Sequence, residues 1–184
     1  MKKIIISVLG QDRPGIIAAV SQLLYENDSN IENVSQTSLQ SEFAGIFIAT
    51  IPGGRPLAEL AHKLESVLTP MGLQVHVKPV EPRHEETNGL FGESFVITTR
   101  GPDQKGLVAR VTAVIARHQV NITNCQAVFK GGANPNDNTM IYEVDIPPQT
   151  SQAEFFRDLR AKGAELDLNV SIQHRDIFMA LNRI

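Results

Sequence analysis

The pattern of apolar and polar residues predicts the same series of elements twice along this chain of 184 residues. In the first half, apolar runs predict strands covered on both faces, and a more polar run is typical of a strand at a sheet edge. The central strands are expected at 2–9 and 43–51, the edge strand at 31–40 and a last strand at 73–78. Apolar residues at helical spacing predict helices at about 14–26 and 56–71. The predicted order is therefore βαββαβ.

The second half repeats this order. Its strands are expected at 94–99, 121–130, 139–146 and 167–173, and its helices at 104–118 and 151–162. Ser151 and Glu154 form a capping-box signature at the start of the second helix. A stretch rich in Gly, Asn and Pro over 131–138 predicts a loop inside the hairpin. The residues from 176 onward predict a short helical tail that docks on a neighbouring surface.

This order predicts an α+β protein made of two tandem ferredoxin-like βαββαβ units. With right-handed crossovers, each unit is a four-stranded antiparallel sheet with two helices on one face. The first unit is expected to span 1–80 and the second 93–184, with a polar linker at 81–92. The other face of each sheet is not polar enough to face water, so we expect it to meet a partner.

A glycine-bounded turn joins the first strand to the first helix in both halves. From Gly10 to Gly15 it reads Gly-Gln-Asp-Arg-Pro-Gly, and from Gly101 to Gly106 it reads Gly-Pro-Asp-Gln-Lys-Gly. One interpretation is structural, because glycines permit a tight turn. The other is a binding site: a helix N-terminus presents free N–H groups and the positive end of the helix dipole to a carboxylate. Gly15 and Gly106 would then allow the ligand close to the backbone.

Other residues of the two halves refine this hypothesis. Asp12 is expected to cap the helix that follows the first turn. Asn30 and Asn121 follow the helices, roughly 20 Å from the turn of their own unit, so they would serve the turn of an adjoining unit. Arg13 and Gln104 differ between the copies. We therefore expect inequivalent turns, and one empty turn is an alternative.

Composition and single-residue signals exclude several classes of protein. A net charge of −3 gives no basic field for a nucleic-acid backbone, so no direct nucleic-acid binding is expected. The single cysteine, Cys125, excludes an intrachain disulfide and is expected to be buried on a strand. The turns lack the Gly-Lys-Ser/Thr ending of a phosphate loop, the five histidines lack metal-ligand spacing, and no nucleophile elbow is present. We expect a non-catalytic protein without metal or cofactor.

The apolar start of the chain is too short for a signal peptide, and no run approaches the length of a membrane span. No membrane association is therefore expected, and the cytoplasm is the predicted location.

Both halves resemble the ACT domain. The resemblance rests on a strand, Gly-x-Asp-x-x-Gly, an amphipathic helix and Asn-Ile opening the next strand. Two such units most resemble the glycine cleavage system transcriptional repressor family. The resemblance implies a regulatory module that binds a small ligand, usually an amino acid, between the first turn of one domain and the Asn corner of another. It carries over to Gly10, Asp12, Arg13, Gly15, Asn30, Gly101, Asp103, Gln104, Gly106 and Asn121.

Two functions remain as alternatives. The first is a regulatory protein that binds an amino acid such as glycine at ACT domain interfaces and modulates a partner. The protein would then be a transcriptional regulator of glycine or one-carbon metabolism. Because no DNA-reading motif is present, it would act through a DNA-binding transcription regulator as its partner. The alternative is a protein-interaction module without a small-molecule ligand. The open sheet faces favour a homodimer, although pairing the two units of one chain would bury the same surface.

Overall fold

The computed structural model describes residues 1–54, 56–81, 92–129 and 138–181. Contacts divide the chain into two compact units, Met1–Pro82 and Arg83–Ile184, which are called unit 1 and unit 2 below. The predicted linker at 81–92 and the predicted hairpin loop at 131–138 lie almost wholly outside the described residues, as does the end of the predicted tail. Each unit is described by itself.

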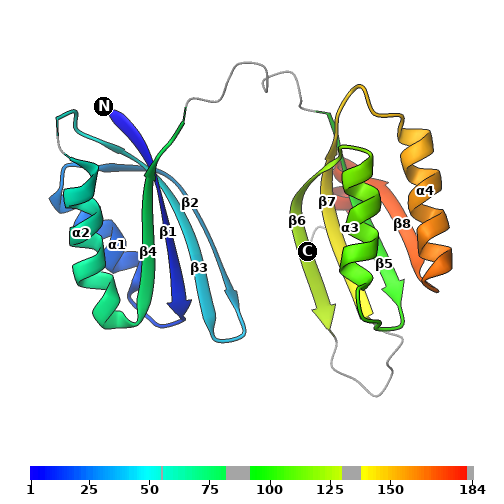
Figure 1. Cartoon of the computed structure of the whole chain (residues 1–184), viewed down its shortest axis with the longest axis horizontal. Helices are drawn as coiled ribbons and strands as arrows, with labels where there is room; N and C mark the ends of the chain where they lie inside the picture. Colours follow the sequence, from blue (N-terminus) through cyan, green and yellow to red (C-terminus); the bar gives the residue numbers. More distant parts are fainter. Residues whose placement is uncertain (55, 82–91, 130–137, 182–184) are drawn as a thin grey trace. The chain divides into compact units, whose positions relative to one another are not determined.

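Unit 1 has the predicted order βαββαβ (Figure 1). Its strands are β1 (Lys2–Gln11), β2 (Asn30–Leu39), β3 (Glu42–Ile51) and β4 (Leu73–Pro79). Its helices are α1 (Ile16–Glu26) and α2 (Leu57–Leu68), and a 3-10 helix (Thr69–Met71) follows α2. The sheet order is β2-β3-β1-β4, and all neighbours are antiparallel. The predictions of an edge β2 and of central β1 and β3 are confirmed.

Unit 2 repeats this topology with one addition. Its strands are β5 (Glu93–Gly101), β6 (Asn121–Phe129), β7 (Asn138–Ile146) and β8 (Asn169–His174). Its helices are α3 (Leu107–Arg117), α4 (Gln152–Glu165) and a short α5 (Arg175–Leu181). The sheet order β6-β7-β5-β8 is again antiparallel throughout. Apart from α5 and the 3-10 helix of unit 1, the sheets and helices of the two units correspond element by element.

Alternation along the central strands decides which face of each sheet is buried. Every second residue of β3 from Phe43 to Ile51 is buried and packs toward α1 and α2. α1 meets this face with the stripe predicted from its periodicity, namely Ile16, Val20, Leu23 and Leu24. The predicted arrangement of two helices on one face of each sheet is therefore confirmed.

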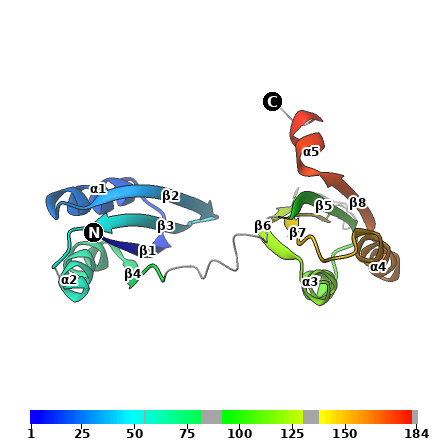
Figure 2. The ribbon, with the colours of Figure 1, turned by 90° about the horizontal axis from the view of Figure 1, so that it is seen from above.

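Helix α5 lies on the face of the unit 2 sheet opposite α3 and α4 (Figure 2). It follows β8 directly and contacts β5 and β8. Arg175 Nε, at its start, lies 3.7 Å from Glu143 Oε2 on β7. Val96 of β5 points toward this face and is only 2% exposed. The predicted helical tail therefore covers part of the open face of its own unit.

Two local predictions have opposite outcomes. Ser151 caps α4 as predicted, since its Oγ accepts a hydrogen bond from the Glu154 N–H at 3.5 Å. The prediction of a buried Cys125 is wrong, because this residue is exposed. Cys125 lies on the edge strand β6, and a position on an edge strand is covered by only one neighbouring strand.

Candidate functional site

The first turn of α1 presents backbone N–H groups at the surface of unit 1. Gly15 caps the helix with a φ of 98°, a left-handed conformation that favours glycine. The first helical hydrogen bond runs from the Ala19 N–H to the Gly15 carbonyl at 2.9 Å, so the N–H groups of residues 16–18 have no partner within the helix. This turn holds no acidic side chain, whereas α2 carries Glu59 in its first turn. The positive end of α1 is therefore available to an anion.

Asp12 does not cap α1, so that prediction is wrong. Its carboxylate accepts a hydrogen bond from Ser38 Oγ on β2 at 2.6 Å, and its N–H donates to the Ser41 carbonyl at 2.7 Å. Gly15 occupies the capping position instead. Asp12 thus ties the turn to the β2–β3 hairpin, and its side chain remains at the surface.

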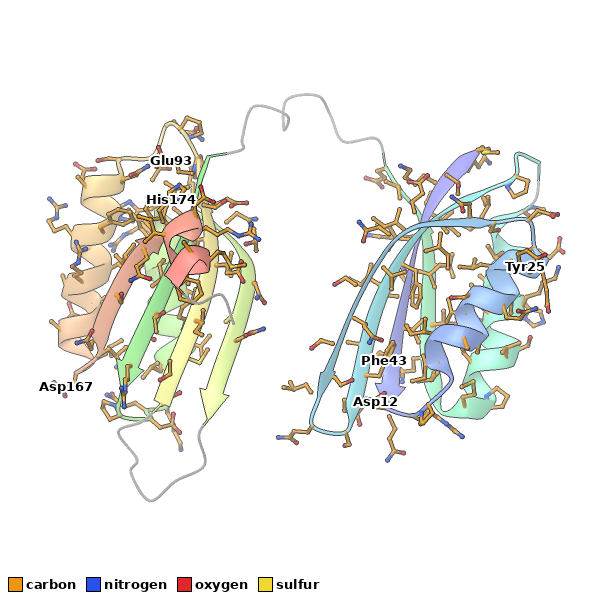
Figure 3. All side chains as sticks on the ribbon, turned by 180° about the vertical axis from the view of Figure 1, so that it is seen from behind. Asp12, Tyr25, Phe43, Glu93, Asp167 and His174 are labelled. Carbon is orange, nitrogen blue, oxygen red and sulfur yellow. The ribbon has the colours of Figure 1, made fainter. Side chains whose placement is uncertain are left out.

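A surface pocket of about 460 Å³ joins the turn to β2. It is lined by residues 12–18 together with Gln36, Ser38 and Phe43. Asp12 and Phe43 lie at the same end of unit 1, where β1 leads into α1 (Figure 3). The volume falls in the range of pockets that hold small molecules.

The sequence did not reveal the pocket residues on β2 and β3. β2 is polar on both faces, so its periodicity does not show which side chains face the helices. The antiparallel register provides that information, since Gln36 pairs with Gly45 and Ser38 pairs with Phe43, both buried. Gln36 and Ser38 therefore lie on the helix side of the sheet, next to the turn.

Arg13 and Gln104 make equivalent contacts in the two units. Arg13 Nη1 donates to the Met71 carbonyl at 3.5 Å, and Gln104 Nε2 donates to the Leu166 carbonyl at 2.9 Å. Each side chain ties its turn to the corner that precedes the last strand of the unit. The Arg13 guanidinium carries further N–H donors, and the residue lines the pocket.

The four motif glycines serve two purposes. A Cβ on Gly10 or on Gly101 would lie 2.6 Å from a carbonyl oxygen of the corner before the last strand. These two glycines permit close packing of the backbone. A Cβ on Gly15 would meet nothing within 4 Å, and Gly106 has a similar left-handed φ of 79°. Gly15, unlike Gly10, therefore leaves room for a ligand beside the backbone.

Asn30 and Asn121 are exposed at the starts of β2 and β6. The 11 residues of α1 separate Asn30 from the turn by about 16 Å at 1.5 Å per residue. A cavity lined partly by Asn27 and Ser29, at that end of unit 1, has a volume of only about 10 Å³, room for one water molecule at most. Unit 1 therefore does not bring its asparagine to its own turn.

Unit 2 has polar residues at the end of the sheet next to its turn, where unit 1 has apolar ones. By strand register, Thr99, Asn138 and Tyr142 stand in place of Val8, Phe43 and Phe47. Asn138 Nδ2 donates to Asp103 Oδ1 at 3.3 Å. Within the described ranges, Thr99 Oγ1, Asn138 Oδ1 and Tyr142 Oη have no hydrogen-bond partner.

The Tyr142 phenol is a neutral group at physiological pH. Burial raises the pKa of Tyr142 to about 12, and the Cys125 thiol adds to this rise. Thr99 lies close enough to oppose the shift without reaching hydrogen-bond geometry. The hydroxyl therefore remains available as a donor.

Charged clusters elsewhere do not form a second candidate site. Asp158 on α4 contacts His118 at 3.1 Å and Arg117 at 3.0 Å, at the end of α3 far from the turn. Hydrogen bonds from His118 and Arg157 hold the pKa of Asp158 below its usual value. Among the described residues, no three His, Cys, Asp or Glu side chains are placed to hold a metal ion. No helix in the ranges that the structure describes is long and apolar enough to cross a membrane.

Two βαββαβ units, each with a glycine turn leading into its first helix, define a tandem ACT-type protein. The chain belongs to the ACT domain family, whose sequence pattern it matches over residues 2–78 and 93–173. It is 39% identical over 79 residues to a UPF0237 protein of Methanocaldococcus jannaschii, covering 42% of this chain and 88% of that protein. It is 35% identical over 96 residues to a UPF0237 protein of Methanosarcina acetivorans, covering 52% of this chain and 100% of the relative. Each of these relatives matches about one unit.

Solved structures share the fold over nearly the whole chain. A protein from Galdieria sulphuraria, described as unknown, superposes with a TM-score of 0.76 and 23% identity, over 94% of this chain and 98% of that one. A "putative glycine cleavage system transcriptional repressor" superposes with a TM-score of 0.69 and 19% identity, over 94% and 96%. At these identities the likeness shows the fold alone.

Proposed function

We propose that this ACT protein is regulatory, and that unit 1 binds a free amino acid at the turn between β1 and α1. The observation that supports this most is the pocket itself, in which an unneutralised helix N-terminus lies beside Arg13 and Asp12. A ligand carboxylate suits the N–H groups of α1 and the Arg13 guanidinium. A ligand ammonium suits the carboxylate of Asp12 and the side-chain oxygen of Gln36. Both charged ends of an amino acid therefore have complementary groups.

The other predicted residues have distinct roles in this proposal. Gly15 allows the ligand to approach, while Gly10 and Gly101 shape the turns. Asn30 and Asn121 would reach a ligand only from an adjoining ACT unit, which a homodimer would supply. The second turn, with Asp103, Gln104 and Gly106, is the counterpart site.

Glycine is the smallest candidate ligand. It has five non-hydrogen atoms, so at about 1.5 kcal/mol per atom its dissociation constant is roughly micromolar at best. The regulatory output would be a change in how the protein meets a partner. With a net charge of −3, an effect on transcription would pass through a DNA-binding protein.

A scan of the twenty amino acids by thermal denaturation and isothermal titration calorimetry tests the proposal. At a ligand concentration of about 100 times the dissociation constant, binding should raise the free energy of unfolding by about 2.7 kcal/mol. If no amino acid at millimolar concentration shifts the Tm, the proposal is wrong.

One substitution separates binding from folding. Ala18→Asp puts a carboxylate in the first turn of α1, which should stabilise the helix by about 0.3–1 kcal/mol. The same charge should weaken amino-acid binding by about tenfold or more, since it competes for the helix N-terminus. Ala58→Asp, in the first turn of α2, is the matched control and should bind normally. If the two variants bound amino acids with equal affinity, the N-terminus of α1 would not be part of the binding site.

A protein-interaction module is the second candidate. The open face of unit 1 supports it, because Leu9 and Ile46 are 52% and 51% exposed there, on the same face as Ile5 and Ile48. Such a module should keep its partner binding after Asn30→Ala and Asn121→Ala. A ligand-dependent regulator should lose its response to amino acids in the same double variant.

A further inference from the structure

Because the two units share one fold, each polar residue at the turn end of unit 2 can be compared with the residue at the matched position of unit 1. The polar layer, defined as Thr99, Asn138 and Tyr142, is 1%, 8% and 0% exposed. Each of its members has an unpartnered oxygen within the described ranges. Burial of an unpartnered polar group is unfavourable, and such groups are uncommon in native proteins. Their presence together therefore requires a reason.

The fold does not require the polar layer, because unit 1 forms the same sheet without it. In unit 1, Gly45 makes room for Phe43: a Cβ on Gly45 would lie 2.7 Å from the Phe43 ring. By register, unit 2 has Met140 in place of Gly45 and Asn138 in place of Phe43. Apolar volume has moved to Met140, so an amide at position 138 is not the consequence of a missing side chain.

The available atoms define the chemistry of a guest group. Asn138 Nδ2 is committed to the Asp103 carboxylate, which leaves Oδ1 as an acceptor. The hydroxyls of Thr99 and Tyr142 can each donate and accept. A neutral group that both donates and accepts, such as a hydroxyl or a carboxamide, matches this set.

The polar layer begins at the turn of unit 2 with Asn138 and continues inward to Thr99 and Tyr142. Asn138 pairs with Gly101, the first residue of the turn, and bonds to Asp103 within it. Its counterpart Phe43 lines the pocket of unit 1. Asp103 and Lys105 are exposed beside it.

We propose that the polar layer makes the turn of unit 2 selective for an amino acid whose side chain ends in a hydroxyl or a carboxamide. The apolar Phe43 would make the turn of unit 1 select glycine or an aliphatic amino acid. This inference rests on the amino-acid site proposed above, and it assigns the two turns different ligands.

Nuclear magnetic resonance on the full chain tests the inference, with serine and alanine as probes because they differ by one hydroxyl. The amide signals of Gly15 and Gly106 report on the two turns separately. At Gly106, serine should bind roughly tenfold more tightly than alanine or better, since a site built for a hydroxyl rejects the analogue that lacks it. At Gly15, this preference should be absent.

Two variants connect the preference to the polar layer. Thr99→Val with Tyr142→Phe removes both hydroxyls and restores the residue types of unit 1, so folding should be retained. Serine and alanine should then bind at Gly106 with about equal affinity, while the response at Gly15 stays unchanged. Asn138→Leu removes the amide and should lower the same preference.

The outcomes also separate this inference from the proposed function. A serine preference that survives loss of both hydroxyls, or that is equal at the two turns, overturns the inference. A Gly106 signal that does not respond to serine also overturns it, even if Gly15 responds to glycine or alanine. If neither glycine signal responds to any amino acid, the proposed function fails as well.

Discussion

At the turn end of unit 1 the helix side of the sheet is filled by Phe43 and Phe47, and at the same place in unit 2 by Asn138 and Tyr142. The backbone around these residues has the same strand pairing in both units. Both turns end in a left-handed glycine. In both units the side chain at position 13 or 104 ties the turn to the corner that precedes the last strand. The turn is a shared framework, and the residues beneath it have diverged.

The open faces of the two sheets differ as well. Ile5, Leu9 and Ile48 in unit 1 correspond to Val96, Arg100 and Glu143 in unit 2. In unit 2, α5 covers Val96, and Arg175 of α5 approaches Glu143. The helix that distinguishes unit 2 thus lies where the sheet has an apolar residue to bury. No second copy of α5 covers unit 1 within the described residues.

These differences distinguish the residues that both copies need in order to fold from the residues that vary between the copies. Residues that permit close backbone approach are the same in both units. Residues beneath the turn and on the open face of the sheet are different. Substitutions at matched positions therefore test the comparison directly.

The glycines that open the turns should show the largest effect, and the effect should be large in both units. Gly10→Ala should be the more costly, because Gly10 has a φ of 156° and Gly101 has no positive φ. Gly10→Ala and Gly101→Ala each place a Cβ 2.6 Å from a carbonyl oxygen, so each should lower the free energy of unfolding by about 3 kcal/mol. Urea denaturation gives these values. Gly53→Ala is the control, because its Cβ would meet nothing within 4 Å. A small cost at either Gly10 or Gly101 would show that the turns are not equivalent frameworks.

Exchange of the polar layer should change stability in opposite directions in the two units. In the absence of ligand, Thr99→Val with Tyr142→Phe should raise the free energy of unfolding by about 2 kcal/mol, because two buried unpartnered hydroxyls are removed. Val8→Thr with Phe47→Tyr in unit 1 should lower it by about 2 kcal/mol. Chemical denaturation of both double variants checks the signs. A loss of stability in the unit 2 variant would mean that its hydroxyls are already satisfied.

The open faces should differ in sensitivity by a smaller amount. Val96→Ala should lower the free energy of unfolding by about 1–2 kcal/mol, since Val96 is 2% exposed beneath α5. Ile5→Ala, at the matched position in unit 1, should cost less than about 1 kcal/mol, because Ile5 is only partly buried. Thermal denaturation followed by circular dichroism measures both. Equal costs would indicate that a partner already covers the unit 1 face in solution.

Much of this fold was predictable, because its signals are local. Apolar periodicity located the strands and helices, and the polar character of residues 31–40 placed β2 at an edge. The repeat at a fixed spacing indicated two copies of one unit. The separation of Asn30 from its turn followed from helix length alone. Each of these inferences depends on spacing along the chain.

The rest depended on contacts between distant segments. Asp12 was expected to cap its own helix, but its carboxylate bonds to Ser38, 26 residues away. The exposure of Cys125 follows from the position of β6 in the sheet, which its own residue type does not reveal. The contribution of Gln36 to the pocket required the strand register. The sequence shows which residues are polar. Only the strand pairing in the folded chain shows which neighbour each polar side chain contacts.

The contacts between the helices provide the smallest and most specific test of the comparison. In unit 1, Lys63 Nζ donates to Asn27 Oδ1 at 2.9 Å; at the matched positions of unit 2, Asp158 lies 3.1 Å from His118. The pKa of Asp158 is lowered from 3.8, chiefly by the hydrogen bond with His118 and then by Arg157. A carboxylate with a lowered pKa in the folded state stabilises the fold above its unfolded pKa, and this contribution is lost as the pH falls through the lower value.

Asp158→Asn should therefore lower the Tm modestly at neutral pH, and its difference from the parent should disappear as the pH falls from about 5 to about 2. Asn27→Ala in unit 1 removes a neutral acceptor of the Lys63 hydrogen bond, so its effect on the Tm should not depend on pH over this range. Thermal denaturation across that range measures both differences. If the two variants showed the same pH dependence, the effect would come from the acid titration of the whole chain. A difference confined to Asp158→Asn would show that the duplicated fold holds its helices together by a neutral acceptor in one copy and by a titrating one in the other.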